Sequence, residues 1–350
     1  MNPSFWIGRS VFVTGHTGFK GGWISLWLSN LGAKVHGFSL IPPTTPNFFS
    51  ETQLESRMQS STIADIRDLT TLMSALQTAK PSIVIHMAAQ PLVRESYVRP
   101  VETFSTNVIG TVNLLEAMRS VDSVEAVVNI TTDKCYENRE WVWLYRENDR
   151  LGGHDPYSAS KACAELVATS YRNSFFSKTG IQLASVRAGN VIGGGDWAAD
   201  RLIPDFLRAV DAGKTLRVRS PNAVRPWQHI LEPLSGYLTL AERLVSGGSE
   251  YAEAWNFGPT ELDAKPVSWI LDHLCQKVPD ARWEREESSQ PHEACLLKLD
   301  ITKARTKLGW SPRWSLATGL DKTLEWHQAW RDGRSMTDVS TKQIEEYQSL

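Results

Sequence analysis

Two side chains have the types and the spacing needed for proton transfer. Tyr157 and Lys161 occur in the segment YSASK, and on a helix a separation of four residues places both on one face. A lysine ammonium lowers the pKa of a neighbouring phenol by Coulomb attraction, so the tyrosine can act as a base near neutral pH. The alternative is an exposed helix pair, because this pattern is common by chance. We expect the catalytic pair, since its helix follows a second reactive segment.

That second segment is TTDK at residues 131–134, directly after the apolar run EAVVNI. The run predicts a buried strand, and ligands of open α/β sheets bind beyond the carboxyl ends of the strands. The hydroxyl group of Thr132 can donate a hydrogen bond to a substrate oxygen, and Asp133 can transfer a proton. A solvated turn is the alternative interpretation of the same four residues.

A glycine pattern near the start of the chain predicts a dinucleotide site. Gly15, Gly18 and Gly21 occur in TGHTGFKG, after a predicted strand at residues 10–14 and at the start of a predicted helix at residues 19–31. Such a turn lets a diphosphate approach the backbone and the N–H groups at the start of the helix. A glycine-rich turn without a ligand is the alternative, but the flanking strand and helix favour the dinucleotide.

The choice between NAD and NADP stays open on these residues. In this region an Asp or Glu usually binds the adenine ribose of NAD, or an Arg binds the 2′-phosphate of NADP. Neither an acidic residue nor an Arg occurs between Gly22 and Ser50. Ser39 is the expected substitute, because its hydroxyl follows the second predicted strand. Asp65 and Ile66 end the third predicted strand and could hold the adenine, although a turn before the next helix would explain Asp65 equally well.

Strands and helices alternate over the first half of the chain, which predicts a doubly wound parallel α/β sheet. Strands are expected at residues 10–14, 34–40, 61–66, 82–88, 125–132 and 181–187, and helices at 19–31, 68–78, 101–120 and 156–176. The pattern weakens after Asn190, where a helix at 203–211, a strand at 215–218 and a helix at 233–245 are expected. We therefore expect a dinucleotide-binding domain at 1–189 and a smaller mixed α/β substrate domain at 190–350, with the chain free to cross back. The polar tail after Trp330 is expected to be partly mobile.

Composition excludes several classes of protein. The chain has 350 residues, of which 41% are hydrophobic and 22% charged, as is typical of globular proteins, and its net charge of −2 gives no bulk attraction for nucleic acid. The four cysteines form no CxxC pair, which disfavours a disulfide framework or structural zinc and indicates a reducing, cytoplasmic setting. We expect no signal peptide and no membrane span, and we expect most of the 14 tryptophans to be packing residues.

The glycine pattern, the hydroxyl after the central strand and YxxxK together resemble the extended short-chain dehydrogenase/reductase family. Within it, TGHTGFKGGW, HMAAQPLVRESY, NITTDKCYEN, PYSASKACAE, RAGNVIGGGDWAADRLIPD and RPWQHILEP resemble the CDP-glucose branch of the sugar-nucleotide 4,6-dehydratases. The resemblance extends from about Trp6 to about Trp326. It implies a bound NAD, a CDP-glucose substrate and a role in making deoxysugars such as 3,6-dideoxyhexoses for a bacterial surface polysaccharide.

The resemblance also implies roles for single residues. Tyr157 takes the proton of the sugar 4-hydroxyl, Thr132 positions the 4-oxygen, and Lys161 bonds the nicotinamide ribose. Asp133 protonates the leaving 6-hydroxyl. The dTDP-glucose branch has a glutamate as the base for the C5 proton where this chain has Lys134. Whether Lys134, Tyr157 or another residue accepts that proton stays open.

Two sets of binding residues follow from the motifs and the resemblance. The expected cofactor contacts are Gly15, His16, Thr17, Gly18, Phe19, Gly21, Ser39, Asp65, Ile66, Ala88, Ala89, Gln90, Asn107, Thr131, Tyr157 and Lys161. The expected substrate contacts are Arg94, Ser96, Asn190, Asp196, Trp197, Arg201, Leu202, Arg225 and His229. Ordinary packing is the alternative for Trp197 and His229, and a helix kink is the alternative for Asn107. No metal ligand is expected.

The resemblance implies a homodimer, paired through the helices at 101–120 and 156–176, with any higher assembly left open. No nucleic-acid or membrane partner is expected. Two other functions are weighed. A 4-epimerase or GDP-mannose dehydratase of the same family is one, but epimerisation needs no acid such as Asp133. A non-catalytic NAD-binding regulator is the other, but it would be expected to lose Tyr157 or Lys161.

Overall fold

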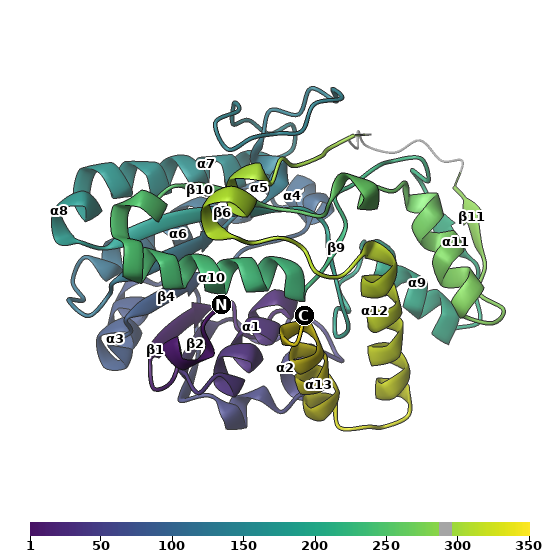
Figure 1. Cartoon of the computed structure of the whole chain (residues 1–350), viewed down its shortest axis with the longest axis horizontal. Coiled ribbons are helices and arrows are strands. Elements are labelled where there is room, and N and C mark those ends of the chain that lie inside the picture. The colour runs from purple at the N-terminus through teal and green to yellow at the C-terminus, as the bar shows by residue number, and fades with distance from the viewer. Residues whose placement is uncertain (287–295) are drawn as a thin grey trace.

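A sheet of seven parallel strands lies at the centre of the computed structural model, which describes residues 1–286 and 296–350 (Figure 1). Its strands are β1 Ser10–Thr14, β2 Lys34–Ser39, β3 Ser60–Ile63, β4 Ile83–His86, β5 Ala126–Ile130, β6 Gln182–Ala188 and β10 Ala254–Phe257. They lie in the order β3-β2-β1-β4-β5-β6-β10. The predicted doubly wound parallel sheet is confirmed.

The apolar sequence of β1 explains its central place. Val11 lies opposite Val35 of β2 and Ile83 of β4, and all three side chains are fully buried. Strands covered on both faces are expected to be continuously apolar. Because all seven strands are parallel, the segments that follow β1, β4 and β5 lie along one edge of the sheet, and the predicted reactive groups are in these segments.

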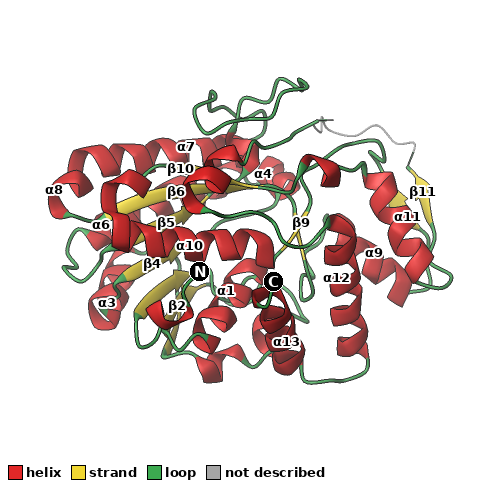
Figure 2. Ribbon diagram, in the orientation of Figure 1, coloured by secondary structure: helices red, strands yellow, loops and turns green. Residues whose placement is uncertain are grey.

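Helices cover both faces of the sheet, and a separate apolar core fills each interface (Figure 2). One face carries α1 Phe19–Asn30, α10 Leu231–Gly247 and α13 Met336–Gln348. The other carries α3 Leu69–Ala79, α6 Gly110–Met118 and α7 Pro156–Tyr171. Five tryptophans, Trp6, Trp23, Trp27, Trp255 and Trp326, are fully buried in the first core, which agrees with a packing role.

A third core lies beside the sheet and belongs to the second half of the chain. It is formed mainly by α9 Leu202–Asp211, β8 Leu216–Val218, α11 Val267–Lys277, β11 Trp283–Arg285 and α12 Leu316–Arg331. A two-stranded pair, β7 Val191–Ile192 and β9 Gln228–His229, connects this part with the sheet, and β10 then returns to pair with β6. The chain therefore crosses back to the sheet, and the boundary at residue 190 stays a prediction.

One expectation for a single element is confirmed with a local irregularity, and another is wrong. The predicted helix at 101–120 is present as α5 Pro100–Phe104, a π-helical turn at Ser105–Ile109 and α6 in direct succession, and the side chain of Asn107 in that turn bonds to partners outside the helix. The tail after Trp330 is ordered as α13, since Met336, Val339, Ile344 and Tyr347 form a buried stripe against α1. Most residues of this segment are polar, so its composition did not predict the buried stripe.

Smaller differences concern the ends of elements. The third strand ends at Ile63, so Asp65 and Ile66 lie in the following turn and not in the strand. The remaining short helices are α2 Phe48–Glu51, α4 Val93–Val98 and α8 Ser177–Thr179. Within residues 1–286 and 296–350, none of the helices has the length and apolarity that a membrane crossing requires.

Candidate active site

The turn between β1 and α1 has room only for glycine. Gly15 has φ +78°, and a Cβ there would lie 2.8 Å from the backbone nitrogen of Ala88. A Cβ at Gly21 would lie 2.0 Å from the carbonyl oxygen of Gly15. Gly18 precedes α1 and offers no side chain to cap its N–H groups. The turn therefore leaves a cradle and a helix N-terminus that fit a diphosphate.

The far end of this turn meets the residues expected at the adenosine. The hydroxyl of Thr17 lies 2.8 Å from that of Ser39 and donates to the carbonyl of Leu40 at 2.8 Å. Asp65 is held by Arg67, with 2.6 Å between Oδ2 and Nη2, and that hydrogen bond lowers the pKa of Asp65. The contact with Arg67 gives Asp65 a structural role in the turn after β3. Its side chain also lines the cavity described below.

The predicted reactive groups meet at the carboxyl end of β5. The hydroxyl of Thr132 donates to Oδ1 of Asp133 at 2.9 Å, and it also hydrogen-bonds Tyr157. Asp155 caps α7 by accepting from the backbone N–H of Ser158 at 2.9 Å, which fixes Tyr157 in the first turn of the helix. One helical turn later, the Nζ of Lys161 donates to the carbonyl of Ile130 at 3.1 Å.

Burial controls the protonation of this cluster. It raises the pKa of Tyr157 to about 12, which the hydrogen bond with Thr132 opposes and the charge of Asp133 reinforces. It lowers the pKa of Lys161 to about 8, which the charge of Glu165 opposes. The pKa of Tyr157 is therefore raised overall, because desolvation of the phenolate is the largest effect, and the expected lowering by Lys161 stays a prediction.

A buried ion pair behind the cluster, which sequence reasoning missed, holds β5, β6 and α7 together. The Nη2 of Arg187 lies 2.9 Å from Oε2 of Glu165, and both side chains are almost completely buried. The other oxygen of Glu165 accepts from the hydroxyl of Thr131 at 2.5 Å. Nη1 of Arg187 also donates to the phenol oxygen of Tyr136 at 2.9 Å. The backbone that presents Thr132 and Asp133 is therefore fixed from behind.

The loop after β7 faces this cluster from the second half of the chain. Within it, Nη1 of Arg201 lies 2.8 Å from Oδ2 of Asp196. A second ion pair joins the loop to α4, with 2.9 Å between Nη1 of Arg94 and Oδ1 of Asp200. The ring of Trp197 packs edge-on against Trp326 and Trp330, so it combines the packing role and a place on the cavity wall.

These segments enclose a cavity of about 1050 Å³. Most of the predicted site residues line it: Gly15, Thr17, Gly18, Phe19, Gly21, Ser39, Asp65, Ile66, Ala88, Ala89, Arg94, Thr131, Thr132, Asp133, Lys134, Tyr157, Lys161, Asn190, Asp196, Trp197, Arg201, Leu202 and Arg225. The cavity is large enough for two nucleotide-sized ligands, and it brings the glycine turn, the reactive cluster and the loop after β7 together.

Five predicted residues lie away from the cavity wall. His16 points toward β3, with its Nε2 2.8 Å from the hydroxyl of Ser61, and His229 packs between Trp23 and Trp314. Burial lowers the pKa of His16 to about 4 and that of His229 to about 3, so both rings are neutral at pH 7. Both therefore have packing roles in the protein by itself.

The other three residues are Gln90, Ser96 and Asn107. The side chain of Asn107 accepts from the backbone N–H of Gln90 at 2.8 Å and donates to the hydroxyl of Ser160 at 2.9 Å. It orders the loop after β4 against α7. Ser96 is buried and donates to the carbonyl of Val93 at 2.6 Å. These side chains support the site from outside the cavity.

Several lining residues were missed by the sequence analysis. Tyr136, Asn138 and His154 come from the segment between β5 and α7. Tyr136 and Asn138 end the stretch NITTDKCYEN, which was a usable signal, whereas His154 lies outside the quoted stretches. Lys20 also lines the cavity, and its position inside the glycine turn was a usable signal. Within the described residues, no group of three His, Cys, Asp or Glu side chains is arranged to hold a metal ion.

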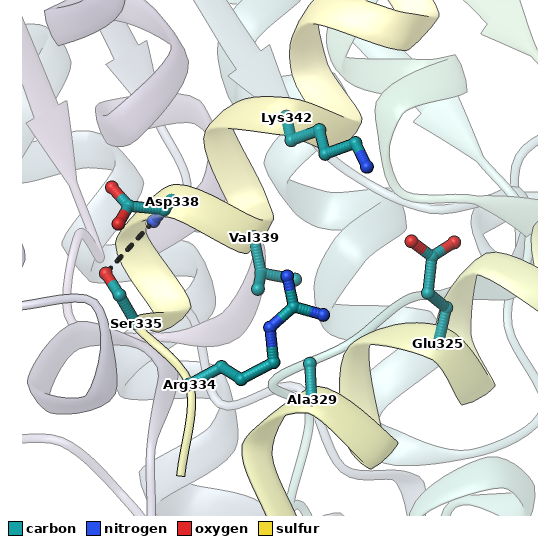
Figure 3. Close-up of a pocket in the computed structure, with 7 residues that line it drawn as sticks. All are labelled: Glu325, Ala329, Arg334, Ser335, Asp338, Val339 and Lys342. Atoms are coloured by element: carbon teal, nitrogen blue, oxygen red, sulfur yellow. Dashed lines mark hydrogen bonds between the residues drawn. The ribbon is translucent and has the colours of Figure 1, made fainter. Parts of the chain in front are cut away.

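A second cavity of about 170 Å³ lies between α12 and α13 (Figure 3). It is lined by Glu325, Ala329, Arg334, Ser335, Asp338, Val339 and Lys342. Acidic and basic side chains are mixed there, and Ser335 caps α13 by accepting from the backbone N–H of Asp338 at 3.4 Å. These contacts account for the cavity as part of helix packing.

Comparison with known proteins places this geometry in a family. The family model for GDP-mannose 4,6 dehydratase matches residues 12–323. A CDP-glucose 4,6-dehydratase from Salmonella typhimurium is 54% identical over 355 residues, which cover 100% of this chain and 99% of that protein.

Two solved structures share the fold. The dTDP-glucose 4,6-dehydratase DesIV from Streptomyces venezuelae, solved with NAD, has a TM-score of 0.77 and 24% identity over 93% of this chain and 99% of that one. The UDP-glucuronic acid 4-epimerase from Bacillus cereus, solved with UDP-glucuronic acid and NAD, has a TM-score of 0.79 and 24% identity over 91% of this chain and 99% of that one. The family model and the Salmonella relative, each matching most of the chain, make this protein a member of the GDP-mannose 4,6-dehydratase family.

Proposed function

We propose that this chain is an NAD-dependent 4,6-dehydratase that converts CDP-glucose to CDP-4-dehydro-6-deoxyglucose and water. The observation that carries the reaction type is the buried carboxyl of Asp133 beside Thr132 and Tyr157, because water loss from C6 needs an acid next to the C4 base. The substrate is supported by the 54% identity with the Salmonella CDP-glucose 4,6-dehydratase over the full length.

The residues around the glycine turn fit NAD. The space that a Cβ at Gly15 or Gly21 would fill is the space that a diphosphate needs, and the start of α1 presents N–H groups there. Lys161 of α7 reaches the carboxyl end of β5 with its Nζ and would hold the nicotinamide ribose. When bound, NAD supplies the acceptor for the C4 hydride and returns that hydride to C6, so that it leaves each cycle unchanged.

The first half of the reaction uses Tyr157 and Thr132. Tyr157 accepts the proton of the 4-hydroxyl while C4 loses its hydride, and Thr132 holds the 4-oxygen by a hydrogen bond. Because burial raises the pKa of Tyr157 to about 12, the phenol must first lose its own proton, and positive charge close by favours that loss. Lys161 and Arg201 supply such charge at this end of the cavity.

The second half of the reaction uses Asp133. The ketone at C4 makes the C5 hydrogen acidic, and loss of that proton expels the 6-hydroxyl, which Asp133 protonates to water. The hydride then reaches C6 and a proton returns to C5, so the sugar loses one water in total. Lys134 and Tyr157 both line the cavity and are candidates for accepting the C5 proton, as is any other base that reaches C5. Tyr157 could accept it only after passing on the proton of the 4-hydroxyl.

A 4-epimerase of the same fold is the second candidate function, since the Bacillus cereus epimerase shares the fold. It would use Tyr157 in the same way but would have no use for the carboxyl of Asp133. A regulator that only binds NAD is disfavoured because Tyr157 and Lys161 are both present and both reach the cavity.

The assembly and the compartment are also part of the proposal. Apolar side chains stand exposed on the segments expected to pair, with Val101 81%, Ile109 51% and Leu166 59% exposed, which favours a homodimer through α5, the π-helical turn and α7. The cysteines among the described residues are free, which suits a reducing cytoplasm, while Cys295 lies outside the described residues.

The test of the reaction uses CDP-glucose carrying deuterium at C4, the purified protein and no added NAD. Mass spectrometry reports water loss, and NMR locates the label. We expect water loss with the deuterium on C6, which would establish both the internal hydride transfer and a retained cofactor.

If no reaction occurs, the assay is repeated with added NAD and then with dTDP-, GDP- and UDP-glucose. Dehydration with a different base alone would keep the mechanism and refute the CDP assignment. Epimerisation, or no turnover with any of these substrates, would refute the dehydratase.

A further inference from the structure

Lys20 places a positive charge on the cavity wall, where Asp133 and Asp196 act on it from beyond ion-pair distance. It is the second residue of α1 and lies within the glycine turn, and its side chain lines the large cavity. The side chain is partly buried. Among the residues that the structure describes, its Nζ has neither a hydrogen-bond partner nor an ion-pair partner. An ammonium in this position is costly unless an anion arrives to pair with it.

The charges around Lys20 bear on the cost of leaving its ammonium without an ion-pair partner. The pKa of Lys20 is lowered to about 8, mainly by burial and also by the positive charges of Arg201 and Lys161, while the carboxylates of Asp133 and Asp196 oppose the shift. Arg201 is already paired with Asp196, and Asp133 already accepts a hydrogen bond from Thr132. Lys20 therefore adds a cation at the junction of the glycine turn, the reactive cluster and the loop after β7.

We propose that Lys20 binds the diphosphate of the ligand that spans this junction. The inference rests on the proposed function, which supplies two diphosphates, one in the nucleotide sugar and one in the dinucleotide. The neighbours Arg201 and Asp133 favour the diphosphate of the nucleotide sugar, because they belong to the loop after β7 and to the group that acts on the sugar. A lysine serves as a point charge for phosphate and needs no fixed fork geometry.

A pH dependence follows from the same contact. Binding of a diphosphate raises the pKa of Lys20. Below about pH 8 the ammonium of Lys20 is therefore mostly protonated both in the free protein and in the complex. Above that pH the free protein loses the proton that the complex keeps. Affinity for the diphosphate should therefore fall as the pH rises through 8, and binding at pH 9 should take up a proton.

The experiment is titration calorimetry of the full chain with CDP and, separately, with NAD, at pH 7 and pH 9. The variants are Lys20→Met, Lys20→Arg and, as a control, Lys178→Met, whose side chain is exposed on α8. Lys20→Met should weaken CDP binding at pH 7 by about 10- to 100-fold and remove the pH dependence. Lys20→Arg should restore much of the affinity for CDP at both pH values. The control Lys178→Met should bind CDP as the unmodified protein does, and the affinity for NAD should stay the same in every variant.

Unchanged CDP and NAD binding by Lys20→Met would overturn the proposal. Weaker binding of NAD alone would support a diphosphate contact but assign it to the dinucleotide and overturn the preference for the nucleotide sugar. Running UDP, dTDP and GDP beside CDP separates these outcomes from the proposed function. If the unmodified protein prefers another nucleoside diphosphate, the CDP assignment fails, and the Lys20 variants are then compared on that nucleotide.

Discussion

In the protein by itself, burial raises the pKa of Tyr157 to about 12 and favours the neutral phenol, so the residue must lose this proton before it can accept that of the 4-hydroxyl. Positive charge brought close to the phenol favours loss of its proton, and the cluster already contains Lys161 and Arg201. The residue therefore has the character of a base that is activated by assembly of the complex and not by Lys161 alone.

Replacing this phenol tests its role. Tyr157→Phe keeps the ring but removes the group that accepts the 4-hydroxyl proton, so turnover should fall by about 10²- to 10⁴-fold. Affinity for NAD, measured by fluorescence titration, should stay close to that of the unmodified protein. Normal turnover in this variant would exclude Tyr157 as the base.

Asp133→Asn tests the acid. The amide keeps the shape of the carboxyl but has no acidic proton for the leaving hydroxyl, so water loss should slow by about 10²- to 10⁴-fold while C4 oxidation continues. Absorbance of the reduced nicotinamide should then accumulate in a single turnover. Equal slowing of both steps would count against Asp133 as the acid.

Lys134→Ala is the matched variant at the adjacent position and decides the C5 base. If Lys134 accepts the C5 proton, exchange of that hydrogen with D₂O should nearly stop. Exchange at the normal rate would exclude Lys134 as the base and leave the C5 proton to Tyr157 or another residue.

At the level of elements, β5, β6 and α7 depend on the buried pair of Glu165 and Arg187. Glu165→Gln leaves the guanidinium without its counter-charge in the interior, so the free energy of unfolding should fall by about 3–5 kcal/mol. Glu284→Gln removes the partner of Arg217 on the surface and should cost about 0–1 kcal/mol. Urea denaturation of both variants makes the comparison, and equal losses would contradict the role given to the buried pair.

The sequence predicted elements where local signals and burial agree. β1 and β5 are largely apolar runs, and Asp68 and Asp155 cap α3 and α7, so these elements were readable from residue types. The π-helical turn at Ser105–Ile109 was not, because it depends on bonds from Asn107 to Gln90 and Ser160, which are distant in sequence.

The same limit applies to the site. The glycine pattern identifies the turn whose backbone faces the ligand, and YxxxK identifies the helix that does so. The places of Gly15 and Tyr157 in the site could therefore be predicted. The direction of a single side chain could not. His16 and Lys20 belong to one motif, yet the first points toward β3 and the second into the cavity.

For the whole molecule, the exposed apolar residues of α5 and α7 predict the assembly. The double variant Val101→Glu, Leu166→Glu puts charges on the expected four-helix interface and should convert a dimer to a monomer. Leu262→Glu, at a side chain that is 82% exposed in another part of the chain, is the control. Light scattering after size-exclusion chromatography gives the masses, and a double variant that stays dimeric would refute this interface.

The return of β10 to the edge of β6 also sets an order of events during synthesis. Residues 189–253 lie between the two strands, and at about 5–20 residues per second a ribosome needs roughly 3 to 13 s to make them. During that interval the nascent chain presents the unpaired edge of β6 to its surroundings, and exposed strand edges recruit other chains. We expect chaperone dependence in the cell to concentrate in this interval and to lengthen when translation of residues 189–253 is slowed.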